Sequence, residues 1–245
     1  MGPGNKQVID RVRRFMVLIA SYNIRKAIAS DRQRRPERIL DILAEIGADI
    51  VILQEADRRF GDRHSAIPFH MLAERSPYRA VPYEMRHGSI GWHGNAILVG
   101  PNVQIERYQP LHLPTLEPRG AVLADLAVDG ARMRVVGMHL DLSGLWRRRQ
   151  ARSILDDLER QPVALPTLLA GDLNEWSQGG CLRDFGLHHR PLLLGPSFHA
   201  RRPIGRLDRM FASSGIAVEE CGVHRSMLAR TASDHLPVWA RVRLE

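Results

Sequence analysis

Short apolar runs of strand length recur along the whole chain, and this pattern constrains the fold more than any other feature. Runs such as "VLIASYN", "DIVILQ" and "PTLLAG" are long enough for a buried strand and too short for a buried helix. Only two long segments repeat their apolar residues with the 3.6-residue period of an amphipathic helix. Many strands with few helices between them predict two sheets packed on each other, with the helices outside.

The two helical segments have clear boundaries. The first begins at Pro36 and ends at Gly47, which are favoured positions for these residue types. The second covers 145–160, and its arginine cluster 147–152 is interpreted as a solvated helix face. Strands are predicted at 15–23, 49–57, 93–99, 103–108, 120–128, 131–140, 166–171, 206–212, 216–223 and 236–243, with short helices near 65–74 and 179–185.

Length and composition predict one domain with an anionic partner. A chain of 245 residues with 44% apolar content can bury a complete core, so we expect a disordered basic arm at 1–14 and a single domain at 15–245. The net charge of +8 favours nucleic acid, phospholipid headgroups or phosphorylated metabolites, and does not choose among them. The chain has two cysteines and no apolar run of membrane-spanning length, which predicts a cytoplasmic protein; we expect a monomer.

Polar side chains stand at the ends of the apolar runs. Burying carboxylates and imidazoles costs several kcal/mol each unless they are paired, so their repetition at strand ends predicts one shared polar site. In isolation "GDLN" could be only a turn, because Asp and Asn also favour turns. The residues concerned are Asn23, Glu55, His139, Asp141, Asp172, Asn174, Asp208, Asp234 and His235.

This set of side chains suits hydrolysis of a phosphate ester. Carboxylate and carboxamide oxygens, as in Glu55, Asp172, Asn23 and Asn174, are ligands for Mg2+, and Mn2+ can substitute for it. Cys and His clusters with zinc spacing are absent from the sequence. Histidines remain available to hold phosphoryl oxygens and to handle the proton of the attacking water.

The same residues carry a resemblance to a known family. "SYNIR", "LQEAD", "GMHLDL", "GDLNEW", "GRLDRMFAS" and "SDHLPV" occur in the order of the endonuclease/exonuclease/phosphatase superfamily. This superfamily includes pancreatic-type deoxyribonuclease, abasic-site endonucleases, sphingomyelinases and inositol polyphosphate 5-phosphatases. The resemblance runs from about residue 15 to 243, and the chain looks most similar to short, uncharacterised bacterial members. It implies a deoxyribonuclease-like four-layer α/β sandwich, in which two packed mixed sheets are flanked by helices.

The resemblance also implies roles for the residues of these motifs. Glu55 looks like the principal metal ligand, with Asn23 beside it and Asp234 close to the metal. Asp172, helped by Asn174, looks like the residue that orients or deprotonates the attacking water. His235 looks like a phosphate-contacting histidine paired with Asp208. A histidine at position 139 disfavours abasic-site endonucleases, which have a tyrosine-bearing segment in this region.

Our leading hypothesis is a Mg2+-dependent phosphodiesterase with a nuclease-like substrate. Arg119, Arg201, Arg202 and Arg206 are candidate anion contacts, and Asn95 stands beside a position that the family uses near the site. The alternative is a phospholipid-headgroup phosphodiesterase of sphingomyelinase type, or a phosphomonoesterase. A lipid substrate predicts an exposed apolar loop anchored by Trp92, Trp146 or Trp176. A non-catalytic phosphate-binding module is a remote alternative, because the residue set is intact.

Overall fold

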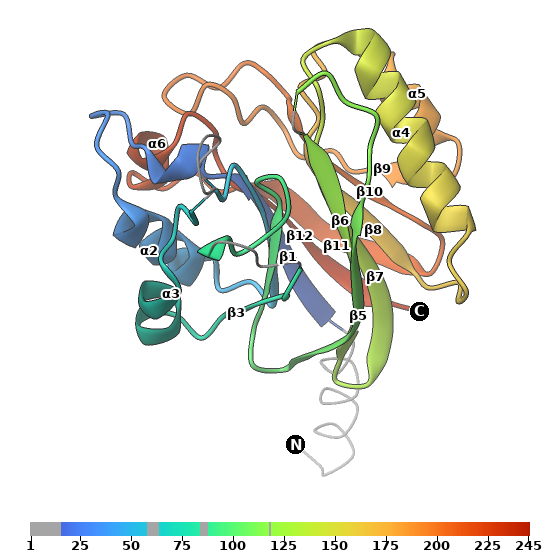
Figure 1. Cartoon of the computed structure of the whole chain (residues 1–245), viewed down its shortest axis with the longest axis horizontal. Helices are drawn as coiled ribbons and strands as arrows, with labels where there is room; N and C mark the ends of the chain where they lie inside the picture. Colours follow the sequence, from blue (N-terminus) through green and yellow to red (C-terminus); the bar gives the residue numbers. More distant parts are fainter. Residues whose placement is uncertain (1–15, 58–63, 84–87, 118) are drawn as a thin grey trace, which may run out of the picture.

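Two mixed sheets, each of six strands, pack face to face in a computed structural model that describes residues 16–57, 64–83, 88–117 and 119–245 (Figure 1). The expected disordered arm at 1–14 lies outside the described residues. The first sheet has the strand order β11-β12-β1-β2-β4-β3. Its strands are β1 (Met16–Asn23), β2 (Ile50–Gln54), β3 (Arg79–Ala80), β4 (Ala96–Val99), β11 (Ile216–Val223) and β12 (Val238–Leu244).

The second sheet has the strand order β5-β6-β7-β8-β10-β9. Neighbouring strands of this sheet are antiparallel, except that β7 and β8 are parallel. Their paired residues run from Arg134 opposite Thr167 to His139 opposite Asp172. Its strands are β5 (Val103–Leu111), β6 (Gly120–Val128), β7 (Ala131–His139), β8 (Thr167–Asp172), β9 (Arg190–Pro191) and β10 (Asp208–Ala212).

Each sheet contains one parallel strand pair, and a helix connects the two strands of each pair. Helix α2 (Pro36–Ile46) connects β1 to β2, and helix α4 (Gly144–Glu159) connects β7 to β8. A parallel connection has to return the chain to the starting end of the sheet, which is why it needs a helix and not a tight turn. In both pairs the carboxyl ends of the strands therefore lie at the same edge of their sheet.

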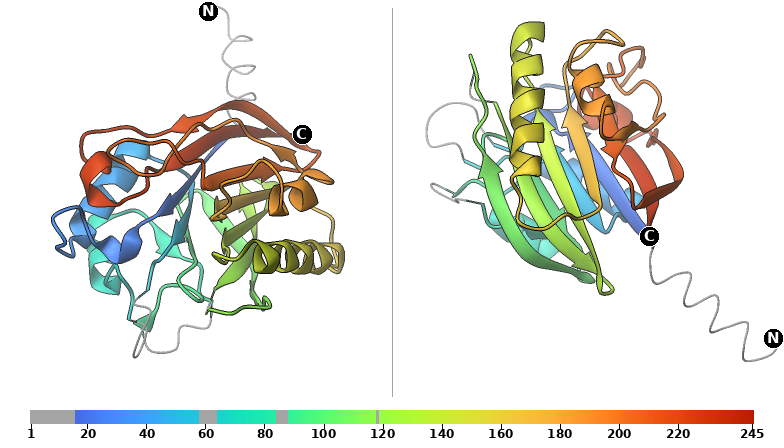
Figure 2. Two further views of the ribbon diagram at one scale, coloured as in Figure 1. Left: turned by 90° about the horizontal axis from the view of Figure 1, so that it is seen from above. Right: turned by 90° about the vertical axis from the view of Figure 1, so that its right-hand side faces the viewer.

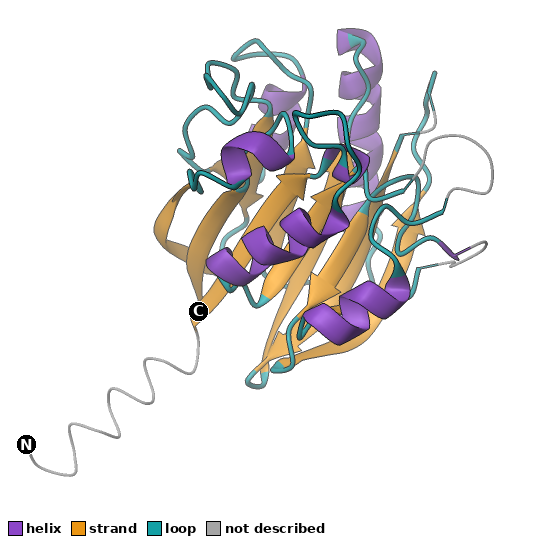
Figure 3. Ribbon diagram, turned by 90° about the vertical axis from the view of Figure 1, so that its left-hand side faces the viewer, coloured by secondary structure: helices purple, strands orange, loops and turns teal. Residues whose placement is uncertain are grey.

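Three apolar layers hold the four layers of backbone together. One cluster fills the space between the sheets and contains Ile19, Ile52, Val135 and Met210. A second cluster packs α2, α3 (Phe69–Arg75) and α6 (Ala229–Ala232) on the outer face of the first sheet (Figure 3). A third packs α4 and α5 (Cys181–Gly186) on the outer face of the second sheet (Figure 2). The predicted four-layer sandwich is confirmed.

The long elements agree with the sequence-based prediction. Helix α2 starts at Pro36, and Gly47 ends it with a left-handed φ of 63°, which a glycine adopts without steric cost. The prediction missed β3, β9 and α6, which have two to four residues and are too short to show a period. None of the described helices is long and apolar enough to cross a membrane.

Arg147 is the exception to the predicted solvated arginine face of α4, since Arg148, Arg149 and Arg152 are exposed. Arg147 is buried, with 8% of its surface exposed. Its guanidinium donates to Glu175 and to the carbonyl oxygens of Asp141 and Leu142. The helical period alone cannot reveal this, because the partners come from the loop after β7 and the loop after β8. Arg147 thereby ties together the two loops that leave the parallel strand pair of the second sheet.

Candidate active site

The predicted polar residues meet where the strands of both sheets end. Asn23 is the last residue of β1, and Glu55 directly follows β2. His139 and Asp172 end the parallel strands β7 and β8 and lie opposite each other in the register. The antiparallel strand β10 starts at this edge, and its first residue Asp208 pairs with Asp172. The segment before β12, which carries Asp234 and His235, enters from the same edge because β12 runs antiparallel to β1.

Asp172 lies at the centre of this cluster and is 1% exposed. Its Oδ2 atom accepts a hydrogen bond from Asn23 Nδ2 at 2.9 Å. The Nε2 atoms of His139 and His235 lie 3.4 Å and 3.6 Å from the same oxygen. Its Oδ1 atom accepts from the backbone N–H of Asn174 at 3.0 Å. Residues from β1, β7, β8 and the segment before β12 thus converge on one carboxylate.

The surroundings of Asp172 favour its ionised form. Burial raises the pKa of a carboxyl group, but here the charge of His235, the contact with His139 and the N–H of Asn174 outweigh it. The pKa of Asp172 therefore lies well below its usual range. A carboxylate of this kind is a strong hydrogen-bond acceptor and a weak base.

Asp208 and His235 form a buried pair beside Asp172. His235 Nδ1 lies 2.8 Å from Asp208 Oδ2, and the hydroxyl of Ser197 donates to the same oxygen. Burial lowers the pKa of an imidazole, but the carboxylates of Asp208 and Asp172 reverse this effect and raise the pKa of His235 to about 10. The ring is then protonated at neutral pH, with Nδ1–H directed to Asp208 and Nε2–H directed toward Asp172.

Two places in the site have the chemistry to hold a cation. Asp172, Asp208 and His235 offer ligand atoms within 4.8 Å of one another, so this cluster could bind a metal ion. A protonated imidazole cannot ligate a metal, however, and the hydrogen bonds above favour that form. Burial raises the pKa of Glu55, but the charge of His139 and then the hydrogen bond from Lys26 outweigh it and lower that pKa, so the carboxylate is ionised. Glu55 with the side-chain oxygen of Asn23 is a donor set that fits a hard divalent cation.

The backbone is strained at two of the site residues. Glu55 has a φ of 52° and Asn174 a φ of 50°, in the left-handed region that residues other than glycine rarely adopt. The Asn174 side chain donates to the carbonyl oxygen of Leu140 at 2.9 Å, so it joins the loop after β8 to the end of β7. Strain of this kind persists where the surrounding structure fixes it, and it is frequent at active sites.

The expected anion contacts fall into two groups. Arg119 is buried and its guanidinium contacts His139 Nε2 and Glu117, which places it in the site. Arg201 is exposed on the loop before β10. Asn95 is fully buried and donates to the carbonyl oxygen of Gly120 at 2.9 Å, while its Oδ1 atom has no hydrogen-bond partner among the described residues.

Asp234 pairs with a cation and not with the central cluster. Its Oδ2 atom lies 3.3 Å from Nε of Arg25, and both side chains are partly exposed. The neighbouring hydroxyl of Ser233 donates to the carbonyl oxygen of Asn23 at 2.7 Å, which fixes this segment against the end of β1.

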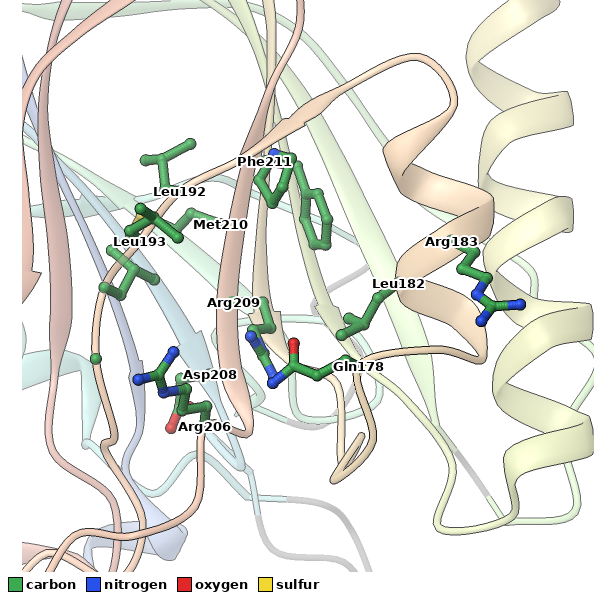
Figure 4. Close-up of a pocket in the computed structure, with 13 residues that line it drawn as sticks. Gln178, Leu182, Arg183, Leu192, Leu193, Arg206, Asp208, Arg209, Met210 and Phe211 are labelled. Carbon is green, nitrogen blue, oxygen red and sulfur yellow. The ribbon is translucent and has the colours of Figure 1, made fainter.

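A pocket of about 210 Å3 lies beside Asp208 (Figure 4). Arg206 lies next to Asp208 at one end of this pocket, and Arg209 and Gln178 extend toward one another near its middle. The Nε atom of Arg209 is buried without a hydrogen-bond partner among the described residues, and burial together with Arg206 lowers its pKa. Leu193 and other apolar side chains form the opposite wall, so the pocket suits an anionic group attached to an apolar body.

Comparison with known proteins places the chain in a family. The model of the endonuclease/exonuclease/phosphatase family matches residues 20–235. The chain belongs to this family. Its members hydrolyse phosphoric esters and are generally dependent on divalent metals, so the expected enzyme class is confirmed.

Among the relatives of this family member is the uncharacterized protein YbhP of Escherichia coli K12. It is 26% identical over 260 residues, which cover 96% of this chain and 99% of YbhP. The predicted similarity to short, uncharacterised bacterial members is thus confirmed.

Solved structures of the family share the fold. An endonuclease/exonuclease/phosphatase from Bacteroides vulgatus superposes with a TM-score of 0.76 at 16% identity, covering 94% of this chain and 99% of that one. D. rerio TDP2 complexed with single strand DNA product gives a TM-score of 0.72 at 17% identity, covering 93% and 99%. A mannosyl-6-phosphatase from Bacteroides thetaiotaomicron VPI-5482 gives 0.71 at 20% identity, covering 92% and 99%.

Two aromatic residues lie near the site of this family member: Trp176, which ends the motif "GDLNEW" and was predicted as a lipid anchor, and Phe198, which no motif identifies. Trp176 is 63% exposed, and its ring meets Phe198 edge to face at 6.0 Å between centroids. The Phe198 ring in turn lies 4.9 Å from the ring of His235. Ser197 and Lys26 are further residues that sequence reasoning missed. For Lys26 a signal exists, because it and Lys6 are the only lysines among 35 lysine and arginine residues.

Proposed function

We propose that this protein is a Mg2+-dependent phosphodiesterase with a nuclease-like substrate. The observation that carries this proposal is the position of Asp172, whose Oδ2 atom faces an amide N–H and the Nε2 atoms of two histidines at the meeting point of both sheets. His235 Nε2 lies 3.6 Å from this oxygen, so its hydrogen remains available for a bound ligand, whereas His139 Nε2 faces the guanidinium of Arg119. A water molecule and a phosphoryl oxygen are the ligands that suit this arrangement.

Asp172 orients the attacking water in this proposal. Its low pKa makes it a poor proton acceptor, so hydrogen bonding and not full proton removal is the role that fits its environment. Water adds to phosphorus, the bond from phosphorus to the leaving oxygen breaks, and a proton lost by this water is balanced by the proton that the leaving oxygen takes up. His235 holds a non-bridging oxygen through Nε2–H, while Asp208 fixes the orientation of its ring.

Arg119 and His139 complete the anion site opposite His235. Arg119 is buried against His139, and a guanidinium is suited to bind two phosphoryl oxygens at once. Glu55, with Asn23, would hold Mg2+ or Mn2+, and Asp234, which pairs with Arg25, would lie close to the metal. The metal would supply positive charge to the phosphate and lower the pKa of the attacking water.

A nucleic-acid substrate is favoured by charge and by Trp176. The net charge is +8, and an exposed tryptophan beside the reacting centre can stack a base, which contributes about 1–3 kcal/mol per base. Arg206 and Arg209 in the adjoining pocket suit a further phosphate of the same strand.

A phospholipid headgroup is the second candidate, and a specific observation favours it. Leu142, Leu145 and Ile204 are 62%, 60% and 76% exposed. Leu142 lies on the loop after β7, Leu145 in the first turn of α4, and Ile204 on the loop before β10, while Trp176 lies on the loop after β8. Exposed apolar side chains around a phosphate site are suited to rest on a lipid surface. The predicted anchors Trp92 and Trp146 are only partly exposed.

Substrate comparison with matched variants separates these possibilities. The purified protein is assayed with Mg2+ or Mn2+ against single-stranded DNA, RNA, plasmid, sphingomyelin vesicles and a chromogenic phosphodiester, with chelator as the control. We expect hydrolysis of DNA or RNA that chelator abolishes and that Trp176→Ala weakens through KM. Leu187→Ala, which truncates a 75% exposed side chain on the α5 side, should leave KM unchanged.

Two results would contradict the proposal. Full activity after exhaustive chelation would exclude the metal-dependent mechanism. Hydrolysis of sphingomyelin vesicles without hydrolysis of either nucleic acid would replace the leading substrate class with the second one.

A further inference from the structure

A left-handed turn follows β1. Arg25, Lys26 and Ala27 have φ values of 47°, 56° and 57°, although none of them is glycine. Each such residue costs about 1–2 kcal/mol. Hydrogen bonds fix the turn: Lys26 N–H donates to the carbonyl oxygen of Glu55 at 3.1 Å, and Arg34 donates to the carbonyl oxygen of Lys26 at 3.0 Å. The backbone of Lys26 is thus held against Glu55, which is itself strained.

The turn directs the Lys26 side chain to the same glutamate. Its Nζ atom lies 2.6 Å from Glu55 Oε2, and the two side chains are 28% and 24% exposed. An ion pair with this exposure contributes about 0–1 kcal/mol to stability. That contribution is smaller than the conformational cost of the turn. Stability therefore does not explain why the chain brings an ammonium group to this carboxylate.

The residue type at position 26 is unusual for this chain. Lys6 and Lys26 are its only lysines, and arginine supplies every other member of its 35 basic side chains. Arginine binds a carboxylate with a planar fork of two N–H groups, whereas lysine offers a single point charge on a flexible stem. A competing cation therefore displaces a lysine from a carboxylate more readily than it displaces an arginine.

We propose that Lys26 is the resident counter-cation of the metal site. Its ammonium group neutralises Glu55 in the metal-free enzyme and has to leave this carboxylate before a divalent cation can bind there. The inference rests on the proposed function, because it takes Glu55 as the metal ligand. Since both cations compete for one carboxylate, Lys26 weakens metal binding and sets the Mg2+ concentration at which the site fills.

Calorimetric titration of the metal-free, full-length protein with MgCl2 tests this competition without measuring activity. Lys26→Met should lower the Kd for Mg2+ on the order of 10-fold or more, the scale of one charge-assisted hydrogen bond. Lys26→Gly should do the same, and it folds without strain because glycine adopts a φ of 56° freely. Lys26→Arg should raise the Kd above that of the wild type. The control is Arg75→Met, because Arg75 pairs with Asp41 on the surface; its Kd should stay within about 2-fold, since distant exposed charges are screened.

Glu55→Gln separates failure of this inference from failure of the proposed function. If Glu55→Gln abolishes Mg2+ binding while Lys26→Met and Lys26→Gly leave the Kd unchanged, Lys26 does not compete and the metal site stands. If Glu55→Gln binds Mg2+ with the affinity of the wild type, Glu55 is not the ligand and the proposed metal position is wrong. A Kd for Lys26→Arg as low as that for Lys26→Met would overturn the argument from displacement.

Discussion

Replacing Asp172 by asparagine tests the centre of the site, because the two side chains have the same shape. Both carboxylate oxygens accept hydrogen bonds: Oδ2 from Asn23 Nδ2 at 2.9 Å and Oδ1 from the N–H of Asn174 at 3.0 Å. An asparagine amide has one oxygen and one NH2 group, so either orientation places NH2 against one of these donors. Leaving this buried donor without an acceptor lowers the free energy of unfolding by about 1–3 kcal/mol.

The lost charge adds to this cost. The sequence alone predicts that Asp172→Asn leaves stability unchanged or raises it, because a neutral side chain would relieve the repulsion between neighbouring carboxylates in the absence of the metal. The structure changes this expectation, because the imidazole of His235 contacts both Asp172 and Asp208. Removing one carboxylate takes away an attractive partner of that imidazole. We therefore expect a total loss of roughly 2–4 kcal/mol, which lowers Tm by about 5–15 °C for a domain of this size.

The assay combines thermal unfolding with turnover at saturating Mg2+. If Asp172 orients the attacking water, Asp172→Asn should reduce kcat by on the order of 100-fold or more in the folded protein. Asp125→Asn is the matched control, because Asp125 is also buried and accepts from Arg134 on both oxygens, at 2.6 Å and 3.0 Å, away from the site. It should lose stability and keep kcat. A kcat near that of the wild type in folded Asp172→Asn would show that "GDLN" is only a turn. An unchanged Tm would refute the argument that Asp172 accepts two buried hydrogen bonds.

Three further predictions concern the pair beside Asp172 and the packing of the two sheets. Asp208→Asn, His235→Ala and the double variant should lose similar factors in kcat, because residues that act as a unit are non-additive; losses that multiply would separate them. Because the pKa of His235 is raised from 6.5 to about 10, its proton stabilises the metal-free fold fully below about pH 6.5, and this contribution disappears as the pH rises through 10. Tm should therefore fall from pH 7 to 10, and His235→Gln should flatten that part of the curve; an equal slope in the variant would contradict the assignment. Gly137→Ala should lower the free energy of unfolding by about 1–3 kcal/mol and leave kcat unchanged, because the added methyl group would lie 2.6 Å from Ile52 Cγ2 between the sheets. An unchanged Tm would show that the space between the sheets accommodates the methyl group without cost.

The sequence by itself determined the elements and the identity of the site residues. Apolar runs bounded by turn residues located the long strands, and Pro36 with Gly47 set the limits of α2, because these signals depend on local conformation. The polar residues at strand ends could be recognised because a buried carboxylate or imidazole is costly anywhere in a chain. Their order along the chain then identified the family.

Only the tertiary structure decided how these side chains pair. Asn23 and Asp172 are 149 residues apart in the chain and share a hydrogen bond, and no local pattern specifies such a contact. Arg147 reads as a surface residue in the helical period and is buried because two distant loops supply its acceptors. The left-handed turn that brings Lys26 to Glu55 opposes local propensity, so only long-range hydrogen bonds can maintain it.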